Sequence, residues 1–186
     1  FDPENSDIMY VGTGESYTAV NIYRESSSVG NGIWRSNDHG ETWEQLSSTT
    51  DFQYINDIVV RLEGETRVIY AAVVSGIYKG EVFESTPSDG LFRSADDGAT
   101  WTQVLPNIPN TETPYSPSDI ELDGIGRMFV GAMRNNNLLG AGVILHSDDG
   151  LAWTVFDEIT EATFDPENQY YPGRVIVKSA PSDPNR

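Results

Sequence analysis

A segment of about twelve residues that occurs three times constrains the fold of this chain more than any other feature. The copies run from Gly32 to Trp43, from Gly90 to Trp101 and from Gly142 to Trp153, so the tryptophans are spaced by 58 and 52 residues. In each copy an Asp precedes the Trp by five residues and a Gly precedes it by three. A repeat of this period indicates one supersecondary unit that is stacked several times to bury its apolar faces.

Each repeat contains short β-branched and aromatic runs bounded by Gly, Pro, Asn and Asp, which predict strands. In the second repeat we expect four strands, at about 55–61, 67–74, 90–95 and 100–105. First-strand runs recur in phase at Asp57, Asp119 and, more loosely, Arg174. No segment predicts a helix. Four short antiparallel strands at this period are typical of one propeller blade, so we predict an all-β propeller with four-stranded blades.

The predicted blades divide the chain into unequal parts of a single propeller domain. We expect three strands in 1–48, four in 52–105, four in 115–157 and the first strand of a further blade in 173–186. Propellers close with about four to eight blades, and a shorter row leaves sheet edges exposed. About three blades therefore indicate a fragment of a larger propeller, whose remaining blades are its first expected partners.

A turn between the third and fourth strands forms the end of each repeated segment. We call it the boxed turn; its copies span 36–43, 94–101 and 146–153. An Asp side chain accepts backbone N–H groups just ahead of it, Gly adopts the positive φ of a tight turn, and Trp fills the space between neighbouring strands. A catalytic acid is rarely repeated in register, so we interpret these residues as structural. They are Ser36, Asp38, Gly40, Thr42, Trp43, Ser94, Asp96, Gly98, Thr100, Trp101, Asp148, Gly150 and Trp153.

The boxed turns resemble the Asp box, also named the BNR repeat. The chain as a whole is similar to the Asp-box and sortilin-type propeller superfamily, which includes bacterial secreted BNR-repeat proteins, sialidases, xyloglucan-cleaving glycoside hydrolases and sortilin-like receptors. The resemblance implies a propeller fold, with boxes that lie away from any catalytic centre. The third turn departs from the pattern, because His146 replaces Ser and Ala152 replaces Thr.

A second motif bears on catalysis. The run Tyr10-Val11-Gly12-Thr13 resembles a second-strand motif of xyloglucan-cleaving relatives, in which an Asp follows the Thr. Here Gly14 follows the Thr and Glu15 comes next. Neighbouring residues of a strand face opposite sides, so Glu15 is a poor substitute. The catalytic residues are therefore unknown, and the sequence favours recognition over catalysis.

The long connections of such blades all lie at one end, which we call the long-loop face. They span about 13–31, 75–89 and 134–141 within blades, and 47–54, 106–118 and 156–172 between blades. The short turns at 62–66 and 123–126 and the boxed turns form the opposite, short-turn face. Long loops on a rigid scaffold carry function.

Tyrosines and acidic residues are concentrated on the long-loop face. Seven of the nine tyrosines, Tyr54 among them, fall in its loops. Tyrosine beside carboxylates suits stacking and hydrogen bonding to a sugar, or contact with a basic peptide. Our candidate ligand-binding residues are Glu15, Tyr17, Tyr23, Tyr78, Tyr115, Tyr170 and Tyr171.

Composition narrows the partners further. The 29 Asp and Glu against 11 Lys and Arg give a net charge of −18, which disfavours nucleic acid. The chain has no Cys, so it has no disulfide and no thiolate zinc site. We expect no cofactor and no dedicated metal site, although calcium is the ion that loop carboxylates and carbonyls would suit. No apolar run reaches the roughly 18 residues of a transmembrane helix.

We therefore expect a secreted or cell-surface module, of bacterial origin, that recognises a glycan or a peptide through the long-loop face. Two alternatives stay open. One is a glycoside hydrolase of the BNR type whose catalytic acids lie partly outside this stretch. The other is a scaffold or secretion cargo that binds no small ligand.

Overall fold

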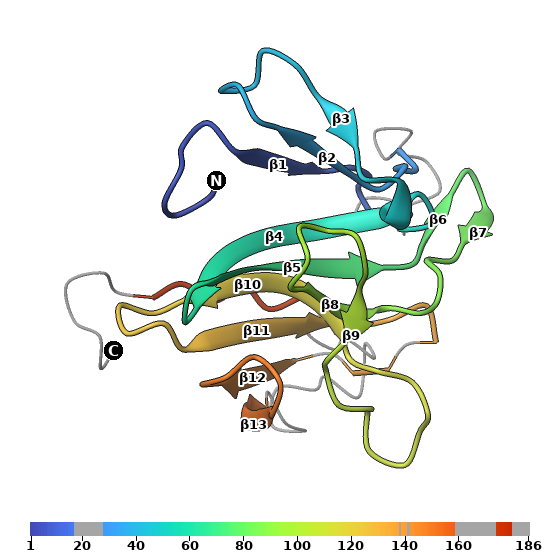
Figure 1. Ribbon diagram of the computed structural model, residues 1–186. Helices are drawn as coiled ribbons and strands as arrows, with labels where there is room; N and C mark the ends of the chain where they lie inside the picture. The colour runs from blue at the N-terminus through green and yellow to red at the C-terminus, as the bar shows by residue number, and fades with distance from the viewer. Residues whose placement is uncertain (17–27, 138, 141, 159–173, 180–186) are drawn as a thin grey trace.

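The computed structural model describes residues 1–16, 28–137, 139–140, 142–158 and 174–179. Three antiparallel sheets stand side by side, and the strands of each sheet follow one another along the chain apart from one inserted hairpin (Figure 1). This is the arrangement of consecutive propeller blades that the repeat predicts. Helical structure in these residues is limited to a 3-10 turn at Ser47–Thr49.

The strands of the three sheets have the following bounds. The first sheet contains β1 (Met9–Gly12), β2 (Ile33–Ser36) and β3 (Glu44–Gln45). The second contains β4 (Tyr54–Glu63), β5 (Thr66–Val74), β8 (Gly90–Ser94) and β9 (Thr102–Gln103). The third contains β10 (Ser116–Leu122), β11 (Met128–Met133), β12 (Val143–Ser147) and β13 (Thr154–Glu158). Between β5 and β8 lies a hairpin that the sequence pattern does not predict, formed by β6 (Gly76–Tyr78) and β7 (Glu81–Phe83).

Strand β5 shows why the sheets stack. Residues 68–74 are all buried, because a neighbouring sheet covers each side of the strand. Side chains alternate between the two sides of a strand. Accordingly, Tyr70 and Ala72 belong to a core shared with the third sheet, whereas Ala71 and Val73 belong to a core shared with the first. A near-continuous apolar run is what burial on both faces requires.

Strands β4 and β10 each carry a β-bulge followed by an Asp that reaches the next blade. The pairing register shifts just before Asp57 and just before Asp119. Asp57 accepts the N–H of Ile120 at 2.9 Å, and Asp119 accepts the N–H of Val177 at 2.9 Å. These equivalent bonds tie the first strand of one blade to the first strand of the next.

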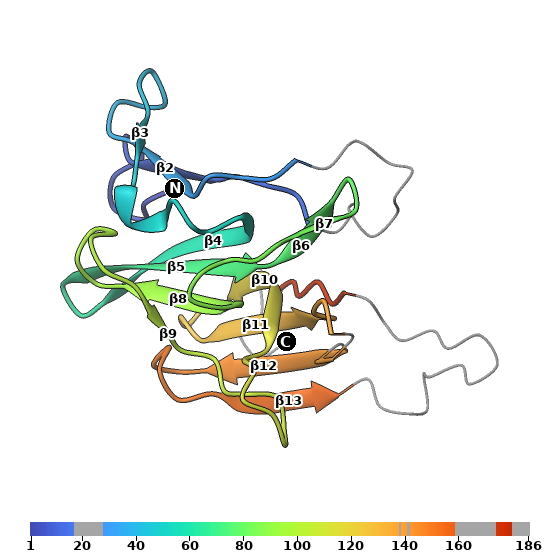
Figure 2. The ribbon, with the colours of Figure 1, turned by 90° about the vertical axis from the view of Figure 1, so that its right-hand side faces the viewer.

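The Asp119 bond places the 174–179 segment beside β10, in the position that β10 itself takes beside β4 (red in Figures 1 and 2). The repeat pattern in the sequence matches Arg174 with Asp119. The structure corrects that match by two residues, because Val177 takes the place of Ile120 and so Ile176 takes the place of Asp119. Because Ile176 has no carboxylate, the sequence pattern does not show that it is equivalent to Asp119.

The two predicted faces are recognisable in Figure 1. The β4–β5 and β10–β11 turns lie at the left of the view, and hairpin β6–β7 lies at the right. The hairpin thus projects from the long-loop face, opposite the short turns.

Candidate ligand-binding face

Hairpin β6–β7 is the most prominent element of the long-loop face among the described residues (Figure 2). Tyr78 pairs with Glu81 across the two-residue turn Lys79-Gly80. Both turn residues have positive φ, 51° for Lys79 and 84° for Gly80. This is the pattern of a type I′ turn, whose twist matches that of the flanking strands. Gly80 adopts a positive φ without strain, whereas a positive φ costs Lys79 about 1–2 kcal/mol.

Aromatic and charged groups lie together on this hairpin. The Tyr78 ring lies 6.4 Å from the Phe83 ring, and Lys79 Nζ lies 5.3 Å from the Tyr78 ring centroid. Both rings are half-buried, while Val82 between them in sequence is exposed. The hairpin therefore combines partly accessible aromatic surface with a cation, an arrangement that suits contact with a sugar or a peptide.

Tyr54 forms a rigid base beneath the hairpin. It is fully buried and packs with Val74, Met133 and Phe83. A Cβ on Gly76 would lie 2.8 Å from the Tyr54 ring, so glycine is needed for this close approach. The Tyr54 hydroxyl finds no hydrogen-bond partner in the described part of the chain, and burial raises the pKa of its phenol. Tyr54 thus positions the hairpin rather than facing a ligand.

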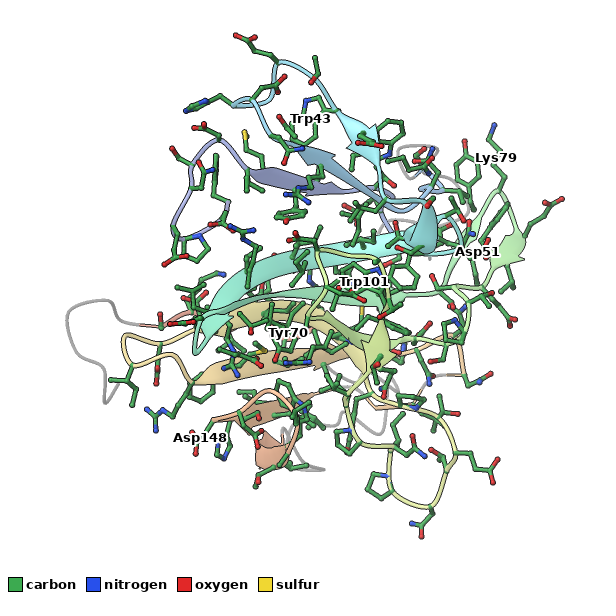
Figure 3. All side chains as sticks on the ribbon, viewed as in Figure 1. Trp43, Asp51, Tyr70, Lys79, Trp101 and Asp148 are labelled. Atoms are coloured by element: carbon green, nitrogen blue, oxygen red, sulfur yellow. The ribbon has the colours of Figure 1, made fainter. Side chains whose placement is uncertain are left out.

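Two polar side chains fix the loop that carries the hairpin. Asp89 accepts the N–H of Ser75 at 2.6 Å and the hydroxyl of Ser116 at 2.6 Å, so it joins the loop to the third sheet. Ser85 donates to the carbonyl of Val74 at 2.7 Å. Asp89 is therefore an anchor. The acids Glu81 and Glu84 on the hairpin segment are exposed, and so is Asp51; Figure 3 shows Asp51 and Lys79 at the same end of the molecule.

The predicted ligand-binding residues have different positions. Tyr78 lies on the hairpin, and Glu15 is exposed beyond β1. Tyr115 is 2% exposed and belongs to the core between the second and third sheets, so the structure removes it from the candidate contacts. Its loop closes on itself through a bridge between Asn107 and Pro114 and turns the ring inward. The other candidates, Tyr17, Tyr23, Tyr170 and Tyr171, lie outside the described residues.

Gly14 occupies the position at which the resemblance would require a catalytic Asp. Its φ is 92°, and a Cβ there would collide with the carbonyl oxygen of Gln53 and lie 3.0 Å from Tyr54 Cα. Thr13 before it is held in place, since its hydroxyl donates to Gly32 O at 2.7 Å. This position therefore has no room for an acidic side chain in this chain.

The first two boxed turns have the same hydrogen-bond pattern. Asp38 accepts the N–H and the hydroxyl of Thr42 at 2.9 and 2.6 Å, and Asp96 accepts those of Thr100 at the same distances. These bonds, first of all that from the Thr hydroxyl, lower the pKa of each carboxyl to about 2. Trp101 donates to Gly98 O at 3.2 Å, which closes the turn. The local bonds use both carboxylate oxygens of each Asp.

The third boxed turn is shorter by one residue than the sequence alignment assumed. Ser147 pairs with Met128 as Ser36 pairs with Met9, so Ser147 is the equivalent serine. Asp149 accepts the Ser147 hydroxyl at 3.0 Å and the N–H groups of residues 151 and 152 at 2.8 Å. The turn acceptor is therefore Asp149 in place of the predicted Asp148.

The same shift explains His146. It pairs with Phe129 as Arg93 pairs with Tyr70, and its ring stacks on that of Phe129 at 6.0 Å. Arg35 likewise lies over Tyr10, 5.8 Å from the ring centroid. An aromatic residue on the second strand and a basic residue on the third thus recur in all three sheets. His146 belongs to that pair and is no substitute for Ser.

Tyr70 is the centre of a buried polar cluster on the short-turn side of the second sheet (Figure 3). Its hydroxyl donates to Glu63 and accepts from Arg93 Nε at 3.2 Å. Burial, and then the bond to Glu63, raises the pKa of Tyr70 to about 12. Arg61 donates to Glu63 and, at 3.0 Å, to Gly126 O of the third sheet. This cluster locks the second and third blades together.

The cavities described in the structure lie away from the hairpin. One of about 490 Å³ lies between β3 and the second boxed turn, with Arg35, Glu44, Leu46 and Gly98 in its lining. Another of about 250 Å³ lies on the short-turn side, beside Glu4, Leu62, Arg67 and Asp97. In the described ranges no three His, Asp or Glu side chains converge as metal ligands, and no helix is long and apolar enough to cross a bilayer.

The chain matches no known protein-family model. It is 29% identical over 139 residues to a xyloglucanase from Paenibacillus sp., a match that covers 69% of the chain and 12% of that protein. It is 28% identical over 130 residues to the xyloglucanase Xgh74A of Acetivibrio thermocellus, covering 61% of the chain and 13% of that protein. The chain therefore spans only a small part of the length of these relatives.

Solved structures show which fold the chain shares. The GH74 enzyme of Niastella koreensis superimposes with a TM-score of 0.53 at 19% identity, over 92% of the chain and 21% of that structure. The GH74 xyloglucanase of Xanthomonas campestris superimposes with a TM-score of 0.53 at 18% identity, over 86% of the chain and 22% of that structure. These likenesses confirm that the chain has the predicted β-propeller fold.

Proposed function

We propose that this chain binds a glycan through its long-loop face and that hairpin β6–β7 supplies the aromatic contact. The observation that carries the proposal is Tyr78, whose partly accessible ring is held between Lys79 and Phe83 above the buried Tyr54. Relatives that are 28–29% identical are xyloglucanases, so xyloglucan is the ligand to test first. A polysaccharide of this kind is met outside the cell, and a secreted or cell-surface location belongs to the same proposal.

The chemistry of the hairpin supports a sugar more than an apolar ligand. The face of a sugar ring is apolar enough to pack on a tyrosine, while its hydroxyls need donors and acceptors nearby. Glu81 lies opposite Tyr78 in the hairpin and supplies an acceptor, and Lys79 supplies a donor. The type I′ turn holds these groups in one geometry before a ligand arrives, which lowers the ordering cost of binding.

A truncation at Tyr78 tests the proposal. In the full chain, Tyr78→Ala should weaken binding of xyloglucan oligosaccharides about tenfold in calorimetry, the loss that removal of a contact worth about 1.4 kcal/mol produces. Phe1→Ala is the matched control, because Phe1 is an exposed aromatic residue remote from the hairpin. Both variants should keep the melting temperature. If Tyr78→Ala binds as tightly as the unaltered chain, the hairpin is not the contact.

Glycoside hydrolysis is the second candidate, and it is favoured by the relatives, which are xyloglucanases. Hydrolysis needs two carboxylates about 5–10 Å apart across one bond. Gly14 occupies the position after Thr13 at which the resemblance places a catalytic acid. Catalytic acids would therefore have to come partly from blades outside this stretch of sequence. Release of new reducing ends from xyloglucan in the calorimetry samples would favour hydrolysis. Preference for a basic peptide over xyloglucan would instead favour the peptide alternative.

A further inference from the structure

Hairpin β6–β7 is hydrogen-bonded to the sheets only through its two ends. At one end the N–H of Ser75 donates to Asp89 at 2.6 Å. At the other end the Ser85 hydroxyl donates to Val74 O at 2.7 Å, and the Ser85 N–H donates to the Ser75 hydroxyl at 2.9 Å. Between these ends, and among the described residues, 76–84 form hydrogen bonds only within the hairpin. The hairpin itself therefore rests on the sheets by packing alone.

The aromatic face of the hairpin is turned toward the sheets. Side chains alternate across a strand, so Tyr78 and Phe83 share one face of the hairpin while Val82 lies on the other. Phe83 packs against the buried Tyr54, whereas Val82 is 57% exposed. A Cβ on Gly76 would lie 2.8 Å from the Tyr54 ring. The face that would stack on a sugar is thus closed down on Tyr54, with no room for a sugar ring between them.

Tyr54 carries an unused hydrogen-bonding group beneath the hairpin. The residue is 0% exposed, and its hydroxyl has no hydrogen-bond partner in the described part of the chain. Most buried polar side-chain atoms have a partner, and one without a partner lowers stability. A phenylalanine would support the hairpin equally well without that loss. The hydroxyl is therefore explained by a bond that forms only when a ligand is present.

We propose, on the basis of the glycan binding inferred above, that hairpin β6–β7 lifts as a rigid flap about Ser75 and Ser85, and that a sugar ring enters beneath it and bonds to the Tyr54 hydroxyl. Elements that move on binding have few buried contacts and few bonds to the rest of the fold, as this hairpin has. Its own cross-strand bonds keep it intact while it moves. Tyr78 then lies over the sugar, and Tyr54 lies below it.

The surroundings of Tyr54 favour a sugar over a charged peptide side chain in this space. Val74 and Met133 pack beside Tyr54, so the hydroxyl is a single polar group among apolar ones. A sugar ring offers an apolar face together with hydroxyls at its edge, which can donate to a phenol or accept from it. A lysine or arginine side chain would lose its hydration there without gaining a carboxylate.

Removal of the Tyr54 hydroxyl tests the contact. In the full chain, Tyr54→Phe should raise the melting temperature by about 2–4 °C, because an unpaired buried hydroxyl is lost. The same variant should weaken binding of xyloglucan oligosaccharides about tenfold in calorimetry. Tyr70→Phe is the matched control, since its ring is equally buried but its hydroxyl bonds to Glu63. It should lower the melting temperature and leave the affinity unchanged. A merely structural Tyr54 would not combine higher stability with weaker binding.

Thiol labelling tests the movement, because the chain has no cysteine of its own. Val74 is 1% exposed and lies beside Tyr54 in the cluster that Phe83 covers. Val73 is 0% exposed and lies in the core between the first two sheets. The two positions are matched in burial and differ in what covers them. Without denaturant, Val74→Cys should react with dithionitrobenzoate at least about tenfold faster than Val73→Cys, since a lifted hairpin uncovers only Val74.

Failure of the flap and failure of glycan binding give different results. Equal labelling of the two thiols would overturn the flap. Unchanged affinity of Tyr54→Phe, under conditions in which Tyr78→Ala weakens binding, would overturn the Tyr54 contact and leave the proposed function standing. A chain that binds no xyloglucan oligosaccharide would overturn both.

Discussion

Replacing Gly150 by Ala should destabilise the protein beyond the cost of the backbone conformation, because Tyr70 occupies the space that a methyl group needs. Gly150 has φ of 74°, and this region costs an Ala about 1–2 kcal/mol. A Cβ at this position would overlap the Tyr70 hydroxyl and lie 2.7 Å from Tyr70 Cζ. Tyr70 is fully buried and bonded to Glu63 and Arg93, so it cannot withdraw. Overpacking costs a further 1–3 kcal/mol or so, which makes a total of about 2–5 kcal/mol.

Two more variants separate the steric cost from the backbone cost. Gly64 has φ of 64° and no atom within 4 Å of a built Cβ, so Gly64→Ala should cost only about 1–2 kcal/mol. Tyr70→Phe removes the hydroxyl that blocks position 150. This change alone should cost about 1.5–3 kcal/mol, because the hydroxyl bonds to a charged carboxylate. In the Tyr70→Phe background, Gly150→Ala should cost about 1–2 kcal/mol less than in the unaltered chain.

Urea unfolding followed by circular dichroism measures all of these free energies. One thermodynamic cycle consists of the unaltered chain, Tyr70→Phe, Gly150→Ala and the double variant. Gly64→Ala is measured in the same experiment. Distant, independent changes add within about 0.5 kcal/mol. If the effects at 70 and 150 add that closely, or if Gly64→Ala costs as much as Gly150→Ala, Tyr70 is not the obstacle and the packing argument is refuted.

The remaining predictions concern the boxed turns. Asp149→Ala should lower the melting temperature more than Asp148→Ala, because Asp149 accepts the bonds of the third turn; equal losses in thermal unfolding would return that role to Asp148. Asp38 and Asp96 have pKa values of about 2 in the folded chain, against an ordinary value of 3.8. Their ionised forms therefore stabilise the fold fully above about pH 4, and this stabilisation is lost as the pH falls toward 2. The urea midpoint should fall over that pH window, and it should fall less in a variant in which both residues are Asn. Trp101→Ala should cost about 3 kcal/mol in urea unfolding and leave xyloglucan affinity unchanged; intact stability with lost binding would contradict its structural role.

The repeat made the architecture predictable because period and pattern express the same physical requirement in every blade. Tyr70 and Ala72 are buried against one neighbour and Ala71 against the other, which demands a continuous apolar run. Gly98 must adopt a φ of 85°, which demands a glycine. Burial on both sides of a strand and a positive φ in a turn each restrict the residue type at a fixed position of the repeat. Such positions can therefore be recognised in the sequence.

The third boxed turn shows where alignment by spacing fails. Counting back from Trp153 and Gly150 places His146 on Ser and Asp148 on Asp. The structure places Ser147 and Asp149 there instead, because the turn is one residue shorter. The signal was present in the Ser-x-Asp spacing, which 147 and 149 keep. The side chains that bond to each other preserve their spacing, whereas the distance to the Trp can change.

The candidate site was less predictable because the loops of this face lack the repeat. Tyr54, Tyr78 and Tyr115 all fall in predicted long loops, yet two are core residues and one lies on hairpin β6–β7. Whether each ring is buried or accessible depends on contacts with other sheets, such as the packing of Tyr115 in the core that includes the third sheet. Composition counts such residues but cannot orient them. In a propeller the recurring positions build the scaffold, so the residues most open to a ligand are those that the period does not constrain.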